Sequence, residues 1–424
     1  MATDPDHLLK NIWLPYTQMK HARPPFEAVA TQGALIRLAD GRTLIDGVAS
    51  WWTACHGYNH PHIQAALRAQ VEAMPHVMFG GLVHEPALRL AERLAAKTPG
   101  DLNHVFFVDS GSVAVEVAMK MAVQYWLNKG VAGRSRMISF RNGYHGDTMA
   151  CMSVCDPDES MHALFKDYLP KQILAELPVD EASAQAFDAL LAREKTRAAA
   201  VLIEPLVQGA GGMKLHDAAT LRRIADSCRR HGLLLIADEI FVGFGRAGTL
   251  FACEQAGVTP DILCLGKGLT GGALPLAAAV ARPHVYEAFL SDDPNHALMH
   301  GPTFMANPLA CAAANASLDL FERETRLAQV AHIEKKLLDG LEPCRNFEGV
   351  LDVRVRGAIG VVQMQTLGDA AALRQSFAER GCWIRPFGDI VYLTPAFTIE
   401  DAQLDALTSA ICDVLAARSQ RAAT

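Results

Sequence analysis

Lys267 and Asp238 are the two residues whose types and spacing point most directly to chemistry. Lys267 stands in a glycine-rich turn after the apolar run Ile262–Leu265, and Asp238 ends a second apolar run, Leu233–Ala237. They lie 267 − 238 = 29 residues apart, the length of one strand–helix–strand unit. An amine and a carboxylate at neighbouring strand ends suit pyridoxal phosphate (PLP) chemistry. The lysine would hold the aldehyde as a Schiff base, and the acid would keep the pyridine nitrogen protonated.

Each half of this pattern is weak by itself, because apolar strands that end in a charged residue are common in α/β proteins. The alternative interpretation is two ordinary strands, one of them followed by a surface lysine. The pattern gains weight only where other strand ends supply a phosphate site and a residue that stacks on the ring.

Two further strand ends carry candidates for those roles. Asp109-Ser-Gly-Ser112 precedes a predicted helix over residues 113–125. The first N–H groups of that helix, with the hydroxyl of Ser110 or Ser112, would hold a phosphate, although a capping serine is the simpler alternative. Tyr144 lies in a glycine-flanked turn, where it would stack on a planar cofactor or pack locally.

Glu204 and Gln208 follow a further apolar run, Ala199–Ile203, and precede a glycine-rich loop. A buried glutamate needs a cationic or hydrogen-bonding partner. A structural salt bridge and a catalytic role are therefore equally compatible with Glu204.

Apolar runs and helical stretches alternate from about residue 104 to residue 283, which predicts an α/β fold with a mainly parallel sheet covered on both faces. Such sheets bind ligands at the carboxyl ends of their strands, where Ser110, Asp238 and Lys267 fall. The strand candidates are His104–Val108, Arg136–Phe140, Ala199–Ile203, Leu233–Ala237, Ile262–Leu265 and Ala277–Val280.

The two ends of the chain predict a small α+β domain built from both termini. The N-terminal part carries glycine- and aspartate-rich turns, and residues 340–424 contain strand-like segments and a final helix from Ile399. An alanine-rich helix is expected after Asn307-Pro308. The expected domains are residues 1–60 and 311–424 for the small domain and residues 61–310 for the large one.

Charge and hydropathy argue against two classes of partner. The 424 residues carry a formal charge of 39 − 46 = −7 without a cluster of lysine and arginine, so we expect no nucleic acid. No run approaches the ~18 apolar residues of a spanning helix, so we expect no membrane insertion. Met1–His7 lacks a basic segment followed by an apolar core, so we expect no secretory signal.

The cysteines and histidines do not predict a metal site. Ten cysteines are scattered, and the nearest pair, Cys151 and Cys155, matches no common zinc pattern. Reduced, packed thiols and a cytoplasmic enzyme are the expectation. His56, His60 and His62 lie in a turn-like segment without an acidic or thiolate partner, so no metal is expected there.

Taken in order, these motifs resemble the class III (ω-amino acid type) aminotransferases of PLP fold type I over essentially the whole chain. Asp238–Arg246 and Leu265–Gly272 carry the resemblance most clearly. It implies a large domain with a seven-stranded type of sheet, a smaller α+β domain and PLP as cofactor. The chain departs from the family pattern at Phe241-Val242, where a small or polar pair is more usual.

The resemblance also implies a role for each residue at the cofactor. Lys267 would form the Schiff base and move the proton, and Asp238 would contact the pyridine nitrogen. The remaining cofactor contacts fall on Ile240 and Tyr144 for the two ring faces and on Gly111 and Ser112 for the phosphate.

Several segments resemble those family members that pass an amino group from S-adenosylmethionine to 8-amino-7-oxononanoate in biotin biosynthesis. The resemblance implies that Arg385 binds the carboxylate of the keto acid and that Thr303, with Gly301 and Pro302, reaches the partner subunit's cofactor in a homodimer with shared sites. The implied substrate pocket consists of Tyr16, Trp51, Trp52, Tyr144 and Gly301. The matching segments are Ile12–Thr17, Ser50–Trp52, His56–Pro61, His76–Gly81, His300–Phe304 and Trp383–Phe387.

Plainer alternatives remain for these residues and for the activity. Trp51 and Trp52 could pack at a domain interface, and Arg385 could pair with a surface acid. An ornithine or 4-aminobutyrate aminotransferase is the nearest alternative enzyme. A non-catalytic PLP-binding protein is the alternative from another class.

Overall fold

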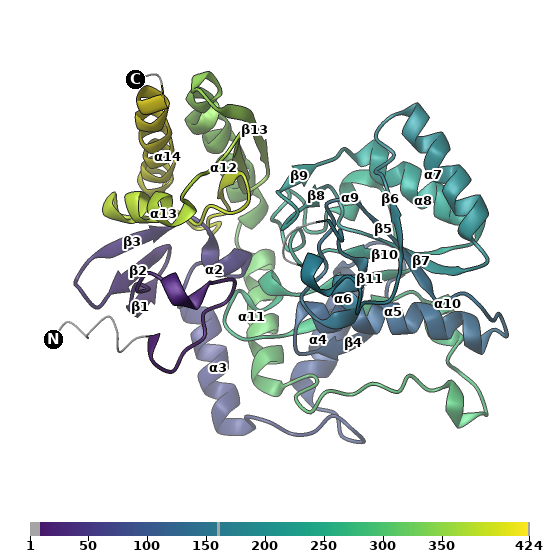
Figure 1. The fold of residues 1–424 in the computed structure, drawn as a ribbon. Helices are drawn as coiled ribbons and strands as arrows, with labels where there is room; N and C mark the ends of the chain where they lie inside the picture. The colour runs from purple at the N-terminus through teal and green to yellow at the C-terminus, as the bar shows by residue number, and fades with distance from the viewer. Residues whose placement is uncertain (1–8, 159–161, 423–424) are drawn as a thin grey trace. The chain divides into compact units, whose positions relative to one another are not determined.

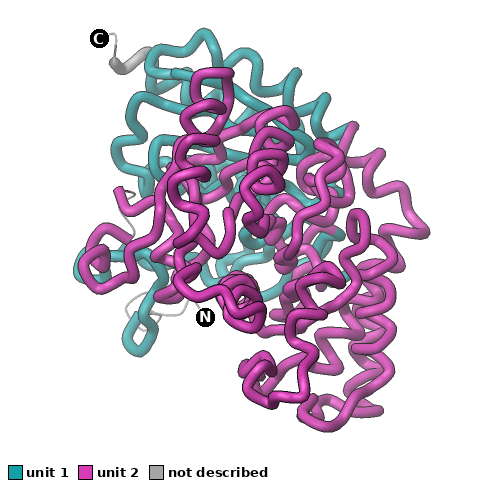
Figure 2. The backbone as a smooth tube through the Cα atoms, turned by 90° about the vertical axis from the view of Figure 1, so that its right-hand side faces the viewer, with its two compact units in different colours: residues 1–51, 56–60, 332–424 teal, residues 52–55, 61–331 magenta. Residues whose placement is uncertain are grey.

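The computed structural model describes residues 9–158 and 162–422. The segment Met1–His7, in which we expect no secretory signal, therefore lies outside the described residues. The chain divides into two compact units, coloured separately in Figure 2. Unit 1 contains the described residues of Met1–Trp51, His56–His60 and His332–Thr424, and unit 2 contains Trp52–Cys55 and Pro61–Ala331.

Unit 2 is built on a seven-stranded sheet with the order β4-β12-β11-β10-β7-β5-β6. Strand β12 pairs antiparallel with both of its neighbours, and the remaining pairs are parallel. The predicted mainly parallel sheet is confirmed. The strands are β4 (His104–Val108), β5 (Arg136–Phe140), β6 (Ile173–Ala175), β7 (Ala198–Ile203), β10 (Leu234–Asp238), β11 (Ile262–Leu265) and β12 (Ala277–Ala281), with a separate pair β8 (Val207–Gln208) and β9 (Lys214–Leu215).

Helices surround this sheet, as Figure 1 shows. The α-helices are α3 (Pro61–Ala73), α4 (Glu85–Lys97), α5 (Gly111–Asn128), α6 (Met149–Val154), α7 (Glu181–Glu194), α8 (Ala218–His231), α9 (Cys253–Ala256), α10 (Pro283–Glu287) and α11 (Pro308–Arg323). Short 3₁₀ turns are η2 (Ala163–Phe165), η3 (Lys267–Thr270) and η4 (Pro294–His296).

Side chains along the central strands alternate between two hydrophobic cores, as the two-residue period of a strand requires. Leu234 and Ile236 of β10 belong to the core that includes α5. Leu235 and Ala237 belong to the core that includes residues of α4, α7, α8 and α11. Helices therefore cover both faces, which is why these strands form continuous apolar runs in the sequence.

Unit 1 contains two smaller sheets, with the orders β1-β2-β3-β15 and β13-β14-β16. The strand-like segments predicted near the C-terminus correspond to β13, β14 and β16. The strands are β1 (Ala28–Gln32), β2 (Leu35–Leu38), β3 (Thr43–Asp46), β13 (Val350–Arg356), β14 (Ile359–Met364), β15 (Cys382–Trp383) and β16 (Ile390–Leu393). The helices are α13 (Ala370–Glu379) and α14 (Asp401–Ala422), with η1 (Met19–His21) and η5 (Glu342–Asn346), while α2 (Ala49–Trp52) and α12 (Arg326–Leu341) cross the unit boundaries.

The boundary between the units falls later in the chain than the predicted domain boundary at residues 310/311. It lies after Ala331, so that α11 belongs to unit 2. Ala313, Ala316 and Leu320 of α11 form a core cluster with Ile63 of α3, and this packing holds the helix to the large unit. Alanine-rich faces let two helices approach closely, which a composition shift in the sequence does not reveal.

Among residues 9–158 and 162–422, no helix combines the length and apolar character of a membrane-spanning segment.

Candidate active site

Lys267 is the first residue of η3 and is separated from the end of β11 by Gly266 alone. Its φ of 45° lies in the left-handed region, which a non-glycine residue adopts at a cost of roughly 1–3 kcal/mol. Its Nζ lies 4.7 Å from the centroid of the Trp52 ring. Burial lowers the pKa of Lys267, and the carboxyls of Asp238 and Glu204 oppose that shift. A lowered pKa enlarges the fraction of neutral amine, the form that acts as nucleophile and base.

Asp238 ends β10 and is buried, with 5% of its surface exposed. In the sheet Asp238 is the register partner of Cys264, three residues before Lys267. The backbone N–H of Ile240 donates to its Oδ1 at 3.1 Å, and the Nδ1 of His145 lies 2.8 Å from its Oδ2. The carboxylate is therefore oriented by two groups.

His145 is a site residue that the sequence analysis did not identify. It directly follows Tyr144 and is buried, and its bond to Asp238 joins residues 93 positions apart. A histidine beside the predicted stacking tyrosine was the available signal, but nothing in the sequence pairs it with an acid on another strand.

Two glycines allow the side chain of Ile240 to pack closely against the backbone. A Cβ on Gly111 would lie 2.9 Å from the Cγ2 of Ile240, and a Cβ on Gly266 would lie 3.3 Å from the same atom. The predicted ring-contacting isoleucine thus packs against backbone that side chains at those positions would displace. Close approach of this kind is a common reason for glycine at a ligand site.

The two serines predicted as phosphate ligands have different roles at the start of α5. The hydroxyl of Ser110 accepts from the N–H of Val113 at 3.4 Å and caps the helix. The Ser112 hydroxyl lies close to Gly146, where a Cβ would be 2.1 Å away. The start of this 18-residue helix, at Gly111 and Ser112, offers N–H groups and a positive dipole end to an anion.

Tyr144 and Glu204 are joined through the backbone. The N–H of Tyr144 donates to one carboxyl oxygen of Glu204 at 2.9 Å, and the N–H of Gly209 donates to the other at 2.8 Å. Burial raises the pKa of Glu204 to about 7. The Tyr144 hydroxyl donates to Asp147 at 2.9 Å, and its ring stacks on that of His162 with centroids 5.8 Å apart.

Phe241, where the chain departs from the family pattern, has a packing role. Its ring lies 4.3 Å from that of Trp52, centroid to centroid, and a Cβ on Gly209 would lie 2.6 Å from it. The bulky residue therefore supports the tryptophan that faces Lys267.

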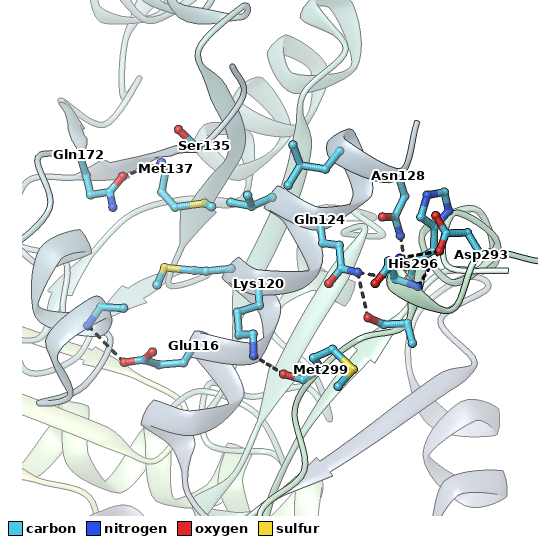
Figure 3. A pocket seen from close by; sticks show the side chains of 16 residues that line it. Glu116, Lys120, Gln124, Asn128, Ser135, Met137, Gln172, Asp293, His296 and Met299 are labelled. Atoms are coloured by element: carbon cyan, nitrogen blue, oxygen red, sulfur yellow. Dashed lines mark hydrogen bonds between the residues drawn. The ribbon is translucent and has the colours of Figure 1, made fainter. Parts of the chain in front are cut away.

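Side chains of α5 hold the segment that precedes Gly301, Pro302 and Thr303, as Figure 3 shows. These side chains line a cavity of about 690 Å³. Gly301 and Thr303 themselves are exposed. Lys120 donates to the carbonyl of Met299 at 2.7 Å. Two amide side chains of α5 donate to carbonyls of His296 and Ala297, and these are Gln124 (3.1 and 2.9 Å) and Asn128 (3.0 Å).

In unit 1 the structure brings three predicted substrate residues together. The guanidinium of Arg385 lies 4.3 Å from the centroid of the Trp51 ring, a cation–π contact. Tyr16 meets the same ring edge-on, with centroids 6.1 Å apart. Burial lowers the pKa of Arg385, and a nearby arginine, Arg374, adds to that effect. The guanidinium of Arg385 is therefore held against the ring of Trp51.

Trp51 belongs to a turn in which Ala49, Ser50, Trp51 and Trp52 all have positive φ, between 44° and 75°. Asp46 holds this turn from within unit 1. Its carboxylate accepts from the N–H groups of Val48 and Ser50 at 2.8 and 2.9 Å and from the hydroxyl of Tyr58 at 2.6 Å. The Ser50 and Tyr58 hydroxyls are 2.5 Å apart.

Tyr58→Phe is expected to lower the stability of the enzyme by about 1–2 kcal/mol, because buried Asp46 loses a hydrogen bond to its carboxylate. The binding of a carboxylate substrate should weaken as well, since the turn that presents Trp51 to Arg385 loses a support. Thermal unfolding and the KM for the acceptor measure the two effects. Tyr168→Phe, at a side chain that is 76% exposed, is the matched control. Equal melting curves for the two variants would contradict the assignment.

The three neighbouring histidines are used separately. His56 and His60, in unit 1, have ring centroids 6.4 Å apart, and His62, in unit 2, has its Nε2 2.8 Å from Asp319. Across the described ranges of the chain, no group of three or more His, Cys, Asp or Glu side chains is arranged to hold a metal ion.

Comparison with known proteins adds the family. The model of the aminotransferase class III family matches residues 16–415. The chain belongs to the class III aminotransferases. The adenosylmethionine-8-amino-7-oxononanoate aminotransferase of Mycobacterium leprae is 47% identical over 422 residues, which cover 97% of this chain and 96% of that protein.

Solved structures agree with this membership. The adenosylmethionine-8-amino-7-oxononanoate aminotransferase of Methanocaldococcus jannaschii has a TM-score of 0.93 at 31% identity, covering 97% of this chain and 98% of that one. An amine transaminase from an uncultivated Pseudomonas species, solved in the PLP-bound form, has a TM-score of 0.88 at 32% identity, covering 96% and 99%.

This class III aminotransferase uses PLP, as its family does, and its residues fit that cofactor. The donor set has an amine with a lowered pKa, an acid held by His145, and a helix start for the phosphate. Ile240, which Gly111 and Gly266 allow to pack closely against the backbone, supplies an apolar side chain suited to contact with a flat ring.

A second buried carboxyl beside Asp238 makes the stability of this aminotransferase depend on pH. Both oxygens of Glu239 accept backbone N–H groups, and burial raises its pKa from 4.5 to about 7. Below about pH 4.5, Glu239 is protonated in both the folded and the unfolded states. As pH rises, the unfolded chain releases its proton first, so stability falls until the folded group also ionises. The full loss is at most about 3 kcal/mol.

The Glu239→Gln variant lacks this titrating carboxyl, so its stability loses the pH dependence that Glu239 causes. The melting temperature of the variant relative to wild type should therefore rise between about pH 5 and about pH 8. Glu348→Gln, at an exposed position, is the control and should follow wild type. A constant difference between Glu239→Gln and wild type across that interval would show that Glu239 does not titrate there.

Proposed function

We propose that the enzyme transfers an amino group from S-adenosylmethionine to 8-amino-7-oxononanoate, giving 7,8-diaminononanoate in biotin biosynthesis. The observation that carries this proposal is the near full-length relation, at 47% identity, to a protein of that name. The unit 1 cluster of Arg385, Trp51 and Tyr16 supports it, because a guanidinium on an aromatic ring suits a carboxylate at the end of an alkyl chain.

The reaction runs in two half-reactions, and the product of the donor leaves before the acceptor enters. When bound, PLP supplies an electron sink that stabilises negative charge on the substrate carbon next to the nitrogen. In its neutral form, the Nζ of Lys267 takes the proton from that carbon and later delivers a proton, so one residue serves as base and acid. Its lowered pKa supports this role.

The carboxylate of Asp238 would keep the proton on the ring nitrogen, and His145 positions that carboxylate through the 2.8 Å contact. Ile240 and Tyr144 cover the two ring faces, while Gly111 and Ser112 bind the phosphate. Trp52 lies over the amine of Lys267 and shields it from water.

For the acceptor, Arg385 binds the carboxylate, and Tyr16, Trp51, Trp52, Tyr144 and Gly301 line its pocket. The enzyme acts as a homodimer in which Thr303 and Pro302 reach the partner's cofactor phosphate. The exposure of Gly301 and Thr303 supports this, because α5 holds the preceding segment in place. A cytoplasmic location accords with ten cysteines that are all free thiols.

A donor-exchange assay tests the proposal. The PLP-loaded enzyme is given 8-amino-7-oxononanoate with S-adenosylmethionine, lysine, ornithine or 4-aminobutyrate, and 7,8-diaminononanoate is measured. Formation of the diamine with S-adenosylmethionine is the expected result. Activity with lysine alone would change the donor, and activity only on ornithine or 4-aminobutyrate would replace the proposed function by the nearest alternative.

A further inference from the structure

Unit 1 contains a cavity of about 700 Å³ to which the proposed reaction gives no role. Tyr16, which we also place in the acceptor pocket, is one of its lining residues, but Trp51 and Arg385 are not. This volume falls within the range of roughly 300–1,000 Å³ that is usual for small-molecule sites. Its apolar walls include Leu14, Phe26, Ile36, Leu38, Leu44 and Trp383.

The one carboxylate among the lining residues is already committed. Asp369 caps the start of α13, where it accepts from the N–H groups of Ala371 and Ala372 at 2.9 Å each. Arg23 donates to its other oxygen at 2.8 Å. Arg23 and the helix start therefore already compensate the negative charge of Asp369, so this carboxylate has little capacity to stabilise a second guanidinium.

That second guanidinium belongs to Arg374, which also lines the cavity. Arg374 is partly buried, and the described part of the chain gives it no hydrogen-bond or salt-bridge partner. Burial lowers its pKa, with a further contribution from Arg23, while Asp369 opposes the shift. A partly desolvated cation without a partner is unfavourable, and an anion bound beside it would offset that cost.

We propose that this cavity binds a small carboxylate with an apolar body, such as a medium-chain fatty acid. The carboxylate would lie on the guanidinium of Arg374, whose planar donors match its two oxygens. The alkyl chain would lie along the walls, where Phe26 and Trp383 meet edge-on with centroids 5.9 Å apart. A phosphate-rich ligand fits less well, because it would need several free cations and would leave the apolar walls unused.

The probe for the test is nonanoate, added to the PLP-loaded enzyme and followed by calorimetry and by tryptophan fluorescence, for which Trp383 is the reporter at the cavity. Nonanol tests the need for the charge, and inorganic phosphate tests the need for the apolar body. Arg374→Gln should weaken nonanoate binding by about tenfold or more, the loss expected of a charged hydrogen-bonded contact. Arg380→Gln, at an exposed position just beyond α13, is the matched control.

Arg385→Gln separates this site from the proposed acceptor site. If the cavity is the site, Arg385→Gln keeps nonanoate binding there and Arg374→Gln keeps the KM for the oxononanoate. Loss of all nonanoate binding in Arg385→Gln, with none lost in Arg374→Gln, overturns the cavity proposal and leaves the proposed function intact. An unchanged acceptor KM in Arg385→Gln contradicts the acceptor role instead.

Three results do not depend on how well a variant folds. Equal wild-type binding of nonanol and nonanoate would overturn the role of the charge, and equal binding of phosphate would overturn that of the apolar body. A crystal structure of the wild-type holoenzyme with nonanoate bound only elsewhere would also overturn the proposal.

Discussion

Lys267→Ala is expected to lower the turnover number by about 10⁴-fold, because the substitution removes both the amine that binds the PLP aldehyde and the base that moves the proton. The lowered pKa of Lys267 and its position at the end of β11 identify it as the residue to test. A single-turnover reaction with reconstituted PLP, followed by exchange of the substrate α-proton with deuterated solvent, measures proton transfer separately from cofactor binding.

Two further variants make that result specific. Lys267→Arg retains the positive charge but not a base, since guanidinium stays protonated, and it should be as inactive as the alanine variant. Lys335→Ala, at an exposed lysine of α12, should leave the rate unchanged. Proton transfer at the wild-type rate in Lys267→Ala would exclude this lysine as the base.

Asp238→Asn is expected to lower the turnover number by about 10³-fold. Asparagine has nearly the shape of aspartate and can still accept from the N–H of Ile240, but it carries no charge with which to hold a proton on the ring nitrogen. The loss should therefore appear in the chemical step, and single-turnover rates with saturating donor measure it.

A cofactor analogue methylated on the ring nitrogen provides the decisive control. It carries a fixed positive charge and should restore part of the activity of Asp238→Asn, because the variant lacks only the means to keep that charge. Asp261→Asn is the matched variant, because Asp261 is a structural acid that accepts from the N–H of Leu235. Activity of Asp238→Asn within tenfold of wild type would contradict the electronic role of Asp238.

The sequence predicts that Lys267 and Asp238 lie at the ends of neighbouring strands because both signals are local, and the strand pairing confirms this placement. Each follows an apolar run that is buried on both faces, and two adjacent parallel strands place their ends together. The contact between His145 and Asp238 could not be predicted in this way. It joins residues 93 positions apart and depends on the path of the turn after β5.

The turn from Ala49 to Trp52 is a second feature that the sequence conceals. Positive φ usually selects glycine, and here four successive residues adopt it without one. The hydrogen bonds that Asp46 accepts hold this conformation, and those bonds arise from tertiary structure. Strand β6 was missed for a simpler reason, since three residues are too few to form a recognisable apolar run.

The division of the chain into two units bears on how such enzymes change in evolution. The residues assigned to the chemistry, Lys267 and Asp238, belong to unit 2, whereas Tyr16, Trp51 and Arg385 belong to unit 1. Trp52, Tyr144 and Gly301, which we also propose for the acceptor pocket, belong to unit 2. Mutations of the unit 1 residues can therefore alter the preferred acceptor while the strand register that aligns amine and acid is inherited unchanged. Libraries made to redirect this enzyme to new ketones can start from Tyr16, Trp51 and Arg385, because these residues lie outside the unit that carries the amine and the acid.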